Sequence, residues 1–263
     1  MMDVRQVCEI VIEAAGRELL PRFQSTARRE KQDGSVVTEA DIAMQSRLKQ
    51  GLAARWPQYA FLGEEMNEDE QSALLRGDAA GVWCVDPLDG TSNFAAGIPF
   101  FAVSLALLVG GEPVLGVVYD PLRRECFSAR RGGGAYLNEQ RLAVARPSIT
   151  LKQAVAIVDF KRLSPALAQR LVTQVPYASQ RSFGSVALDW CWIAAGRGDV
   201  YLHGKQNIWD LAAGSLVLAE AGGQALTLAG EPVYRAELAP RSAVAALDGA
   251  LFQEWLAWLD VPR

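Results

Sequence analysis

The segment 86–94, with the sequence DPLDGTSNF, places two carboxylates three residues apart directly after the apolar run 81–85. An apolar run that ends abruptly in acid and proline is typical of a buried strand, so Asp86 and Asp89 can both face one cavity at the end of a sheet. Gly90 allows the backbone to approach a ligand closely, and the residues after it can begin a helix whose N–H groups suit a phosphate. This combination is what metal-assisted phosphoryl chemistry requires.

Four further acids are candidates for the same site. The helix dipole stabilises an acid in the first turn of a helix, so the presence of such an acid can be explained without a metal. Together with Asp86 and Asp89, however, the four form a set whose repulsion would be costly unless cations neutralised it. They are Glu64 and Glu65, which follow the apolar run 59–62, and Asp41 and Asp210, which lie near predicted helix starts.

Other phosphate-binding and hydrolase motifs fit less well. The glycines at 132–134 are not followed by Lys-Ser or Lys-Thr, as a P-loop requires, and favour a flexible turn between strands. Aspartyl-phosphate phosphatases carry acids at i and i+2, whereas Asp86 and Asp89 lie at i and i+3, so the spacing favours direct attack by water. The single histidine, His203, and the lack of a G-x-S-x-G segment argue against a zinc site and a serine hydrolase.

The elements that must position these acids can be read from periodicity and caps. Helices are expected over residues 4–19 and from the Thr38 cap to about Arg55, with a turn at Asp33-Gly34 and a non-periodic acidic stretch at 64–78. Strands are expected at 81–86, 102–109, 114–119, 125–129 and 134–137, in an antiparallel meander. After Pro147 the pattern alternates, with strands at 154–158, 199–202 and 243–247 and helices at 165–174, 185–195, 209–221 and 252–259.

We therefore predict two domains, an α+β domain at residues 1–147 and an α/β domain at residues 148–263. The chain of 263 residues is half apolar and carries a net charge of −4 without a long block of either sign, which makes nucleic acid an improbable partner. It has no secretory h-region and no apolar stretch near the ~20 residues of a membrane span, so a soluble, cytoplasmic protein is expected. The four widely spaced cysteines are expected to be small apolar fillers.

Taken together, these segments resemble the inositol monophosphatase family, within the larger group of lithium-sensitive magnesium phosphatases. The resemblance covers nearly the whole chain, and the 86–94 motif is highly specific when it is paired with Trp209-Asp210 at this distance. The matching segments are 63–65 (GEE), 86–94 (DPLDGTSNF), 209–214 (WDLAAG), 220–223 (EAGG), 38–41 (TEAD) and Lys31.

The resemblance implies a five-layer α-β-α-β-α sandwich of the sugar phosphatase type, usually dimeric, that holds two or three Mg²⁺ per subunit. It places Glu64, Asp86 and the Leu88 carbonyl on one ion and Asp86, Asp89 and Asp210 on a second. Glu65 would contribute to a weaker third position. The phosphate would be bound by the backbone N–H groups of Gly90 and Thr91, with Lys31 and Asp89 also at the substrate.

The implied mechanism is hydrolysis of a small phosphate monoester by metal-activated water. Glu64 and Thr91 are expected to orient and deprotonate that water, and Asp41 to position the Thr91 hydroxyl. Because the metal supplies most of the acidity, no histidine base is needed.

Substrate choice is expected to lie in the second half of the chain. Gly184 and Ser185 resemble the family segment whose backbone lines the sugar or inositol pocket. In inositol phosphatases a glutamate six residues before the Trp-Asp pair grips ring hydroxyls, and here that position is His203. A neutral histidine accepts once and donates once, so the change weakens the case for inositol phosphate.

Several substrates therefore stay open. Inositol or another polyol monophosphate leads, ahead of 3′-phosphoadenosine 5′-phosphate, fructose-1,6-bisphosphate and histidinol phosphate. A non-catalytic regulatory binding protein is the alternative from a different class, but retention of every expected metal ligand argues against it.

Overall fold

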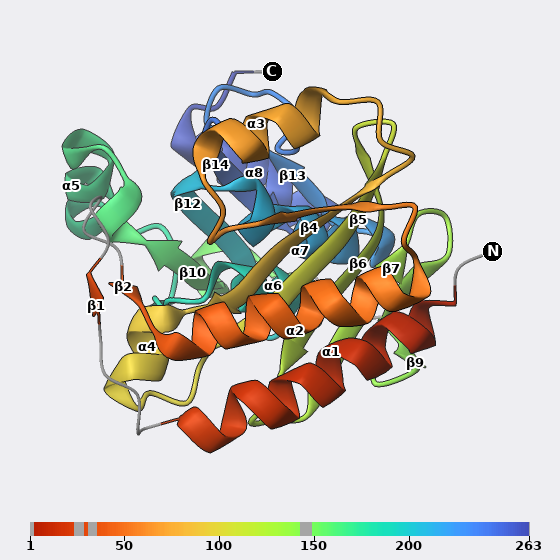
Figure 1. The fold of residues 1–263 in the computed structure, drawn as a ribbon. Coiled ribbons are helices and arrows are strands. Elements are labelled where there is room, and N and C mark those ends of the chain that lie inside the picture. The colour runs from red at the N-terminus through yellow and green to blue at the C-terminus, as the bar shows by residue number, and fades with distance from the viewer. Residues whose placement is uncertain (1–2, 24–28, 31–35, 143–148, 263) are drawn as a thin grey trace.

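The computed structural model describes residues 3–23, 29–30, 36–142 and 149–262 (Figure 1). Most of the first half forms a seven-stranded sheet in which β3 and β4 are parallel and the remaining neighbours are antiparallel. Its strands, in spatial as well as chain order, are β3 (Ala60–Gly63), β4 (Val82–Asp89), β5 (Ala102–Val109), β6 (Glu112–Asp120), β7 (Glu125–Arg130), β8 (Gly134–Leu137) and β9 (Gln140–Arg141).

The second half contributes a five-stranded mixed sheet in the order β11-β10-β12-β14-β13. β10 is parallel to both β11 and β12, and β14 is antiparallel to β12 and β13. These strands are β10 (Val155–Asp159), β11 (Ser179–Arg181), β12 (Val200–Gln206), β13 (Gln224–Leu226) and β14 (Arg241–Ala246). A separate pair joins β1 (Arg29–Glu30) to β2 (Val36–Val37).

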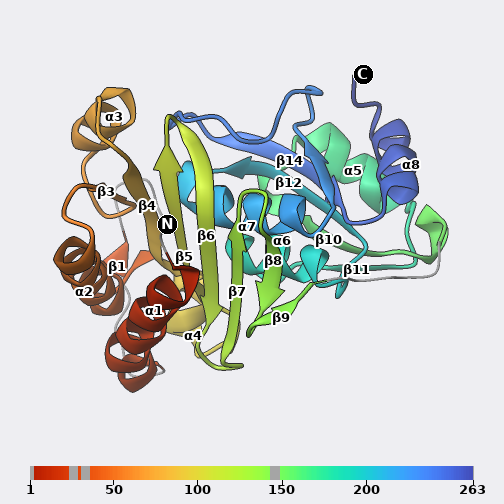
Figure 2. The same cartoon turned by 90° about the vertical axis from the view of Figure 1, so that its right-hand side faces the viewer.

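The helices separate the two sheets and cover their outer faces, giving the five layers seen in Figure 2. Helices α1 and α2 lie on one face of the seven-stranded sheet, α6 and α7 lie between the sheets, and α5 and α8 lie outside the five-stranded sheet. The helices are α1 (Val4–Glu18), α2 (Glu39–Arg55), α3 (Glu68–Arg76), α4 (Thr91–Ala96), α5 (Pro165–Thr173), α6 (Val186–Ala194), α7 (Ile208–Glu220) and α8 (Gly249–Leu259), with 3₁₀ turns at Leu20–Arg22, Leu151–Gln153 and Phe160–Arg162.

Burial explains why the central elements read as continuous apolar runs. All eight residues of β4 are buried, because α2 covers one face of the sheet and α7 the other. Helix α7 is apolar on nearly all sides for the same reason, since it is enclosed between the two sheets. The largest apolar cluster therefore contains residues from both halves of the chain, and the division into domains at residue 147 stays a prediction.

Most of the predicted elements are confirmed, and the structure adds the short strands β1, β2, β9, β11 and β13 together with the following differences. The acidic stretch 64–78 contains α3, whose Asn67 cap and acidic first turn form a helix with only one fully buried side chain, Gln71. β12 runs on to Gln206 through a register shift after His203. The second sheet contains antiparallel as well as parallel pairs. The turn predicted at Asp33-Gly34 lies outside the described residues.

One of the matching segments, 220–223, supports the scaffold. The Glu220 carboxylate, at the end of α7, accepts hydrogen bonds from the backbone N–H groups of Gly132 (2.7 Å) and Gly134 (2.8 Å). The glycines at 132–134 therefore form the predicted turn, and Glu220 fastens that turn to α7. Gly222, just beyond the helix, has φ of +95°, which is typical of the residue that follows a helix end.

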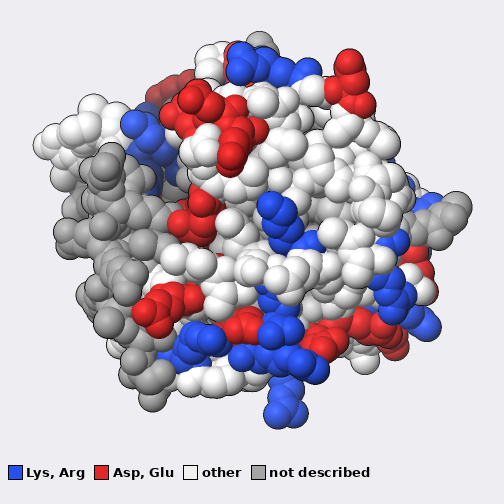
Figure 3. All heavy atoms as spheres, in the orientation of Figure 1, with Lys and Arg blue, Asp and Glu red and all other residues white. Residues whose placement is uncertain are grey.

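On the face shown in Figure 3, acidic and basic side chains are interspersed rather than gathered into a basic stripe. Along α1 and α2 the arginines pair with neighbouring acids, as in Arg17–Glu13 and Arg47–Glu18. Within the described part of the chain, no helix combines the length and the apolar character that crossing a bilayer demands.

Candidate active site

The carboxylates of Asp86 and Asp89 are brought to one side of the sheet by a β-bulge. Residues three apart on a regular strand point to opposite faces. Here Asp86 pairs with Ser104 and Asp89 with Ala102, so β4 carries one more residue than β5 across this interval. The extra residue reverses the alternation and lets both side chains lie on the same side of the strand. The Leu88 N–H donates to Asp86 Oδ1 (2.9 Å) and holds the turn.

Asp210 reaches the same point from the start of α7. Its carboxylate completes a capping box in which Oδ2 accepts the Asn207 N–H (2.9 Å). The Ser104 hydroxyl donates to the Trp209 carbonyl (2.7 Å) and ties this helix start to β5 beside Asp86. As a result, carboxylate oxygens of Asp86, Asp89 and Asp210 all lie within 4.8 Å of one another.

Burial and mutual repulsion dominate the electrostatics of this cluster. Burial raises the pKa of Asp86 well above its usual range, and the charges of Glu64, Asp89 and Asp210 raise it further. The pKa of Asp210 is raised by burial and then by Asp89 and Glu64. Among the described residues, no lysine or arginine forms an ion pair with Asp86, Asp89 or Asp210.

This donor set fits a divalent cation. Buried carboxylates are normally paired or coordinate a metal, because an isolated buried charge is very costly. The ligand atoms are all oxygens, which Mg²⁺ and Ca²⁺ prefer over soft or redox metals. The cluster therefore has the chemistry of a hard-cation site.

Glu64 and Glu65 follow β3, whose parallel pairing with β4 brings the carboxyl ends of both strands to one edge. The Glu64 N–H bonds the Val85 carbonyl (3.1 Å), and the Glu64 charge acts on both Asp86 and Asp210. Glu65 lies nearer to α2, because its N–H bonds Gln45 Oε1 (3.1 Å) and its charge raises the pKa of Asp41. Both glutamates are thus at the rim of the carboxylate cluster.

Asp41 and Thr91 meet as expected. Asp41 Oδ2 accepts from the N–H (2.8 Å) and the hydroxyl (2.6 Å) of Thr38, which completes the cap of α2. The other oxygen, Oδ1, lies 3.1 Å from the Thr91 hydroxyl, which is also 2.9 Å from the Leu88 carbonyl. Burial raises the pKa of Asp41 to about 6, against the lowering effect of the Thr38 hydrogen bonds.

Gly90 and Gly184 approach each other across the two halves of the chain. Gly90 has φ of +91°, and a Cβ there would lie 3.1 Å from the Phe100 carbonyl and 3.2 Å from the Gly184 carbonyl. Only glycine fits this position without strain. Asn93, from α4, donates to the carbonyls of Phe100 (2.8 Å) and Phe183 (2.7 Å), which fixes the loop that carries Gly184.

Ser185 binds Asp89 directly. Its hydroxyl donates to Asp89 Oδ2 (2.5 Å), and the Ala187 N–H at the start of α6 donates to the same oxygen (2.7 Å). Burial raises the pKa of Asp89 to about 6, although these hydrogen bonds from α6 lower it. The structure thus gives Ser185 a partner in the carboxylate cluster, which the sequence did not indicate.

His203 is buried, and protein groups occupy both ring nitrogens. Nδ1 accepts the Lys205 N–H (3.2 Å), and Nε2 lies 3.0 Å from Asp159 Oδ2 on the neighbouring strand, where the two residues are directly paired. Burial opposes ionisation of Asp159, but the hydrogen bond and charge of His203 bring its pKa below the usual range. Contact of His203 with substrate stays a prediction, and Asp159 is the half-exposed carboxylate at this point. Lys31 lies outside the described residues.

Sequence reasoning missed three polar residues around the site. Asp189, on α6, is 4% exposed with its Oδ1 unpaired, and burial together with the charges of Asp89 and Asp159 raises its pKa well above the usual range. Asp159 directly follows the predicted strand 154–158 and was given no role, and Asn93 was only part of the 86–94 motif. An acid inside the apolar run 186–195 was the one signal that could have identified Asp189.

Comparison with known proteins agrees with this geometry. A profile of the inositol monophosphatase family matches residues 3–257. Nus factor SuhB from Pasteurella multocida is 38% identical over 218 residues, which are 80% of this chain and 77% of that protein. Fructose-1,6-bisphosphatase/inositol-1-monophosphatase from Aquifex aeolicus is 33% identical over 235 residues, which are 86% of each protein.

Solved structures extend the likeness to the whole fold. The structure of SaIMPase-II with bound inositol monophosphate has a TM-score of 0.78 at 28% identity and covers 95% of this chain and 90% of that chain. The same values hold for SaIMPase-II with bound 2′AMP. The match to the family profile over nearly the whole chain and the shared fold lead to one conclusion: this chain belongs to the inositol monophosphatase family and is a phosphatase.

Proposed function

We propose that this phosphatase hydrolyses a small phosphate monoester with Mg²⁺ as its cofactor, and that inositol or another polyol monophosphate is its substrate. The observation that carries the proposal is the convergence of the carboxylates of Asp86, Asp89 and Asp210. No lysine or arginine among the described residues forms an ion pair with any of the three. Family membership makes metal dependence the expected explanation of that cluster.

The metal ligands of the proposal are Glu64, Glu65, Asp86, the Leu88 carbonyl, Asp89 and Asp210, for two or three Mg²⁺ per subunit. Leu88 is compatible with this role, because a carbonyl has two lone pairs and the Thr91 hydroxyl uses only one. The position of Glu64 at the end of β3, where its charge acts on Asp86 and Asp210, supports its inclusion. Glu65 would serve the outermost position, since it lies toward α2.

Bound Mg²⁺ would supply Lewis acidity toward the ester and a lowered pKa for the attacking water. Side chains of the protein would orient the attacking water. The Thr91 hydroxyl can donate to only one acceptor at a time, so its contacts with Asp41 and Leu88 leave an oxygen lone pair for a water proton. Glu64 would accept the proton from that water, and Asp41 would fix the rotamer of Thr91.

Phosphate would be held by the N–H groups of Gly90 and Thr91. The Thr91 N–H is in the first turn of α4 and has no intrahelical partner. On the leaving-group side we propose Gly184, Ser185 and the His203–Asp159 pair. Because Asp159 holds the His203 ring and stays half exposed, the pair offers a carboxylate to hydroxyl groups.

The relatives support a phosphorylated metabolite and leave room for a second substrate. SaIMPase-II has been solved with inositol monophosphate and with 2′AMP, and the Aquifex relative carries both fructose-1,6-bisphosphatase and inositol-1-monophosphatase in its name. Fructose-1,6-bisphosphate is therefore the leading alternative, ahead of 3′-phosphoadenosine 5′-phosphate and histidinol phosphate. We further propose a lithium-sensitive cytoplasmic homodimer with domains at 1–147 and 148–263, as the family resemblance implies.

The proposal is tested by phosphate release from a panel of esters with and without Mg²⁺. The panel contains myo-inositol 1-phosphate, fructose-1,6-bisphosphate, 2′AMP, 3′-phosphoadenosine 5′-phosphate and histidinol phosphate. We expect Mg²⁺-dependent turnover that is fastest with the inositol ester. Faster turnover of another ester would replace the proposed substrate and leave the proposed cofactor in place. Equal rates before and after removal of all divalent ions would contradict the proposal that Mg²⁺ is the cofactor.

A further inference from the structure

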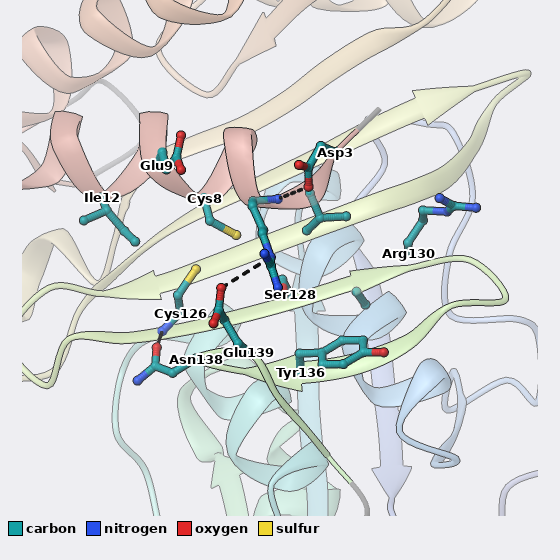
Figure 4. Close-up of a pocket in the computed structure, with 13 residues that line it drawn as sticks. Asp3, Cys8, Glu9, Ile12, Cys126, Ser128, Arg130, Tyr136, Asn138 and Glu139 are labelled. Carbon is teal, nitrogen blue, oxygen red and sulfur yellow. Dashed lines mark hydrogen bonds and ion pairs between the residues drawn. The ribbon is translucent and has the colours of Figure 1, made fainter. Parts of the chain in front are cut away.

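A second pocket lies between α1 and the strands β7 and β8, and none of its lining residues belongs to the proposed active site (Figure 4). Its volume is about 940 Å³. The first three turns of α1 form one wall, and side chains from β7, β8 and the turn after β8 form the other. The residues that matter here are Cys8, Cys126 and Ser128.

Two thiols face each other in this pocket. Cys8 comes from α1 and Cys126 from β7, and their sulfur atoms point toward one another in Figure 4. The side chains of Cys126 and Ser128 are both close enough to Cys8 to affect its acidity. All four cysteines are free thiols, so this contact is a dithiol.

The two thiols differ in exposure and in acidity. Cys8 is half-buried and lines the pocket, whereas Cys126 is 6% exposed. The hydrogen bond from Cys126 lowers the pKa of Cys8, burial opposes this, and the bond from Ser128 lowers it again. The same hydrogen bond to Cys8, followed by burial, raises the pKa of Cys126. Cys8 is thus the thiol that ionises and reacts first, with Cys126 as its neighbour.

We propose that Cys8 and Cys126 form a redox-active pair that a peroxide converts into a disulfide, which fastens α1 to the seven-stranded sheet. The Cys8 thiolate attacks one peroxide oxygen, which breaks the O–O bond, reduces the peroxide and leaves a sulfenic acid with release of water. The Cys126 thiol then attacks the Cys8 sulfur, forms the S–S bond and expels a second water. Two thiols are oxidised for each peroxide reduced.

The remaining cysteines provide internal controls. Cys84 and Cys191 are fully buried in the core between the sheets, where apolar packing accounts for them as expected from the sequence. Burial also raises the pKa of Cys191 well above its usual range. Cys191 is near enough for its charge to affect Cys126, so it is the one competing partner in the chain.

The test is hydrogen peroxide treatment of the full chain, followed by N-ethylmaleimide and peptide mapping without reductant. We expect one cross-linked pair, Cys8 with Cys126, that dithiothreitol reverses, while Cys84 and Cys191 are recovered as alkylated thiols. The matched control, Cys84→Ala, should form the same cross-link. Peroxide that leaves all four thiols intact, or a link from Cys126 to Cys191, would overturn the proposal.

Two variants test the order of events and the tether. In Cys126→Ser, the sulfenic acid of Cys8 should persist and be trapped by dimedone, whereas in Cys8→Ser the cross-link should be lost and Cys126 recovered as a thiol. Oxidised wild-type protein should also melt at a higher temperature than reduced protein, and Cys8→Ser should show no such difference. A cross-link that leaves the melting temperature unchanged would contradict the proposal that the disulfide fastens α1 to the sheet.

Discussion

The Asp41 carboxylate serves two structures at once. One oxygen completes the cap of α2 through Thr38, and the other receives the Thr91 hydroxyl from the far side of the site. A carboxylate can do both because each oxygen accepts more than one hydrogen bond. The start of a helix thereby fixes a residue that lies next to the proposed metal ligands.

Replacing Asp41 by Asn should reduce kcat by roughly 10- to 100-fold, a range typical of residues that orient catalytic groups. The amide has one acceptor oxygen for Thr38, and its NH₂ group would face the Thr91 oxygen and occupy the lone pair that is needed for the water proton. KM should change little, because the phosphate contacts remain. Asp3→Asn is the matched control, since Asp3 caps α1 through the Arg5 N–H at 3.0 Å without touching the site. Steady-state kinetics that show equal effects of the two changes would contradict this role.

His203 contacts Asp159, so we expect an acid at position 203 to disturb Asp159 as well. A glutamate at position 203, as in inositol phosphatases, would place its charge where the ring now lies 3.0 Å from Asp159 Oδ2. We expect His203→Glu to lower the free energy of unfolding by roughly 1–3 kcal/mol. Adding Asp159→Asn should restore much of that loss, because an amide can donate to the new carboxylate.

Urea unfolding of the two single variants and the double variant forms a cycle that measures this coupling. His203→Gln is the control, since its amide can still donate to Asp159. Strictly additive effects of His203→Glu and Asp159→Asn would show that the pair is not coupled.

At the level of elements, sequence patterns predicted the strands and helices that carry the acids because each has a strong local signal. The Thr38–Asp41 capping box and the apolar run before Asp86 are examples. The β-bulge between Asp86 and Asp89 could not be predicted, because it depends on the register of β4 against β5. Helix α3 was missed because it exposes most of its surface, so its sequence lacks an apolar stripe.

The same limit applies to contacts between elements. The pairing of His203 with Asp159 and of Ser185 with Asp89 joins residues that are distant in sequence, and no local pattern announces them. The resemblance supplied the set of acids, and the topology explains how they meet.

The junction of β4 and α4 offers a test at this scale. Gly90→Ala should cost about 1–3 kcal/mol of unfolding free energy, from positive φ together with contacts to two carbonyls. Gly222→Ala is a matched control, because Gly222 has φ of +95° but nothing within 4 Å of an added Cβ. The difference between the two variants in urea unfolding isolates the crowding at Gly90. Equal losses of unfolding free energy in the two variants would mean that the positive φ accounts for the whole effect at Gly90 and that the contacts with the two carbonyls add nothing.

In the whole molecule, several buried carboxylates from both halves of the chain have raised pKa values. A raised pKa means that the folded protein holds the proton more tightly than the unfolded chain does. In the metal-free protein, the stability that these groups contribute is therefore complete below their ordinary pKa near 4 and is lost as the pH rises. For Asp41 and Asp89 the loss extends to about pH 6, and for Asp86 and Asp210 it continues above that.

Magnesium should offset this loss, because a bound cation stabilises the charged carboxylates. We expect the rise in melting temperature caused by Mg²⁺ to be larger near pH 7.5 than near pH 5. Differential scanning calorimetry at both values, with KCl of equal ionic strength as the control, measures the effect. A Mg²⁺-induced shift that is the same at both values would show that these carboxylates do not bind the ion.

The most direct test of the metal assignment is phosphate release as a function of Mg²⁺ concentration in the wild-type protein and in Asp210→Asn. Asp210 comes from α7, in the second half of the chain, yet its carboxylate joins the cluster on β4. If the cluster holds the catalytic cation, the variant should retain its fold by circular dichroism and lose roughly 100-fold or more of its activity at every Mg²⁺ concentration. Wild-type turnover with an unchanged Mg²⁺ dependence in Asp210→Asn would contradict the account.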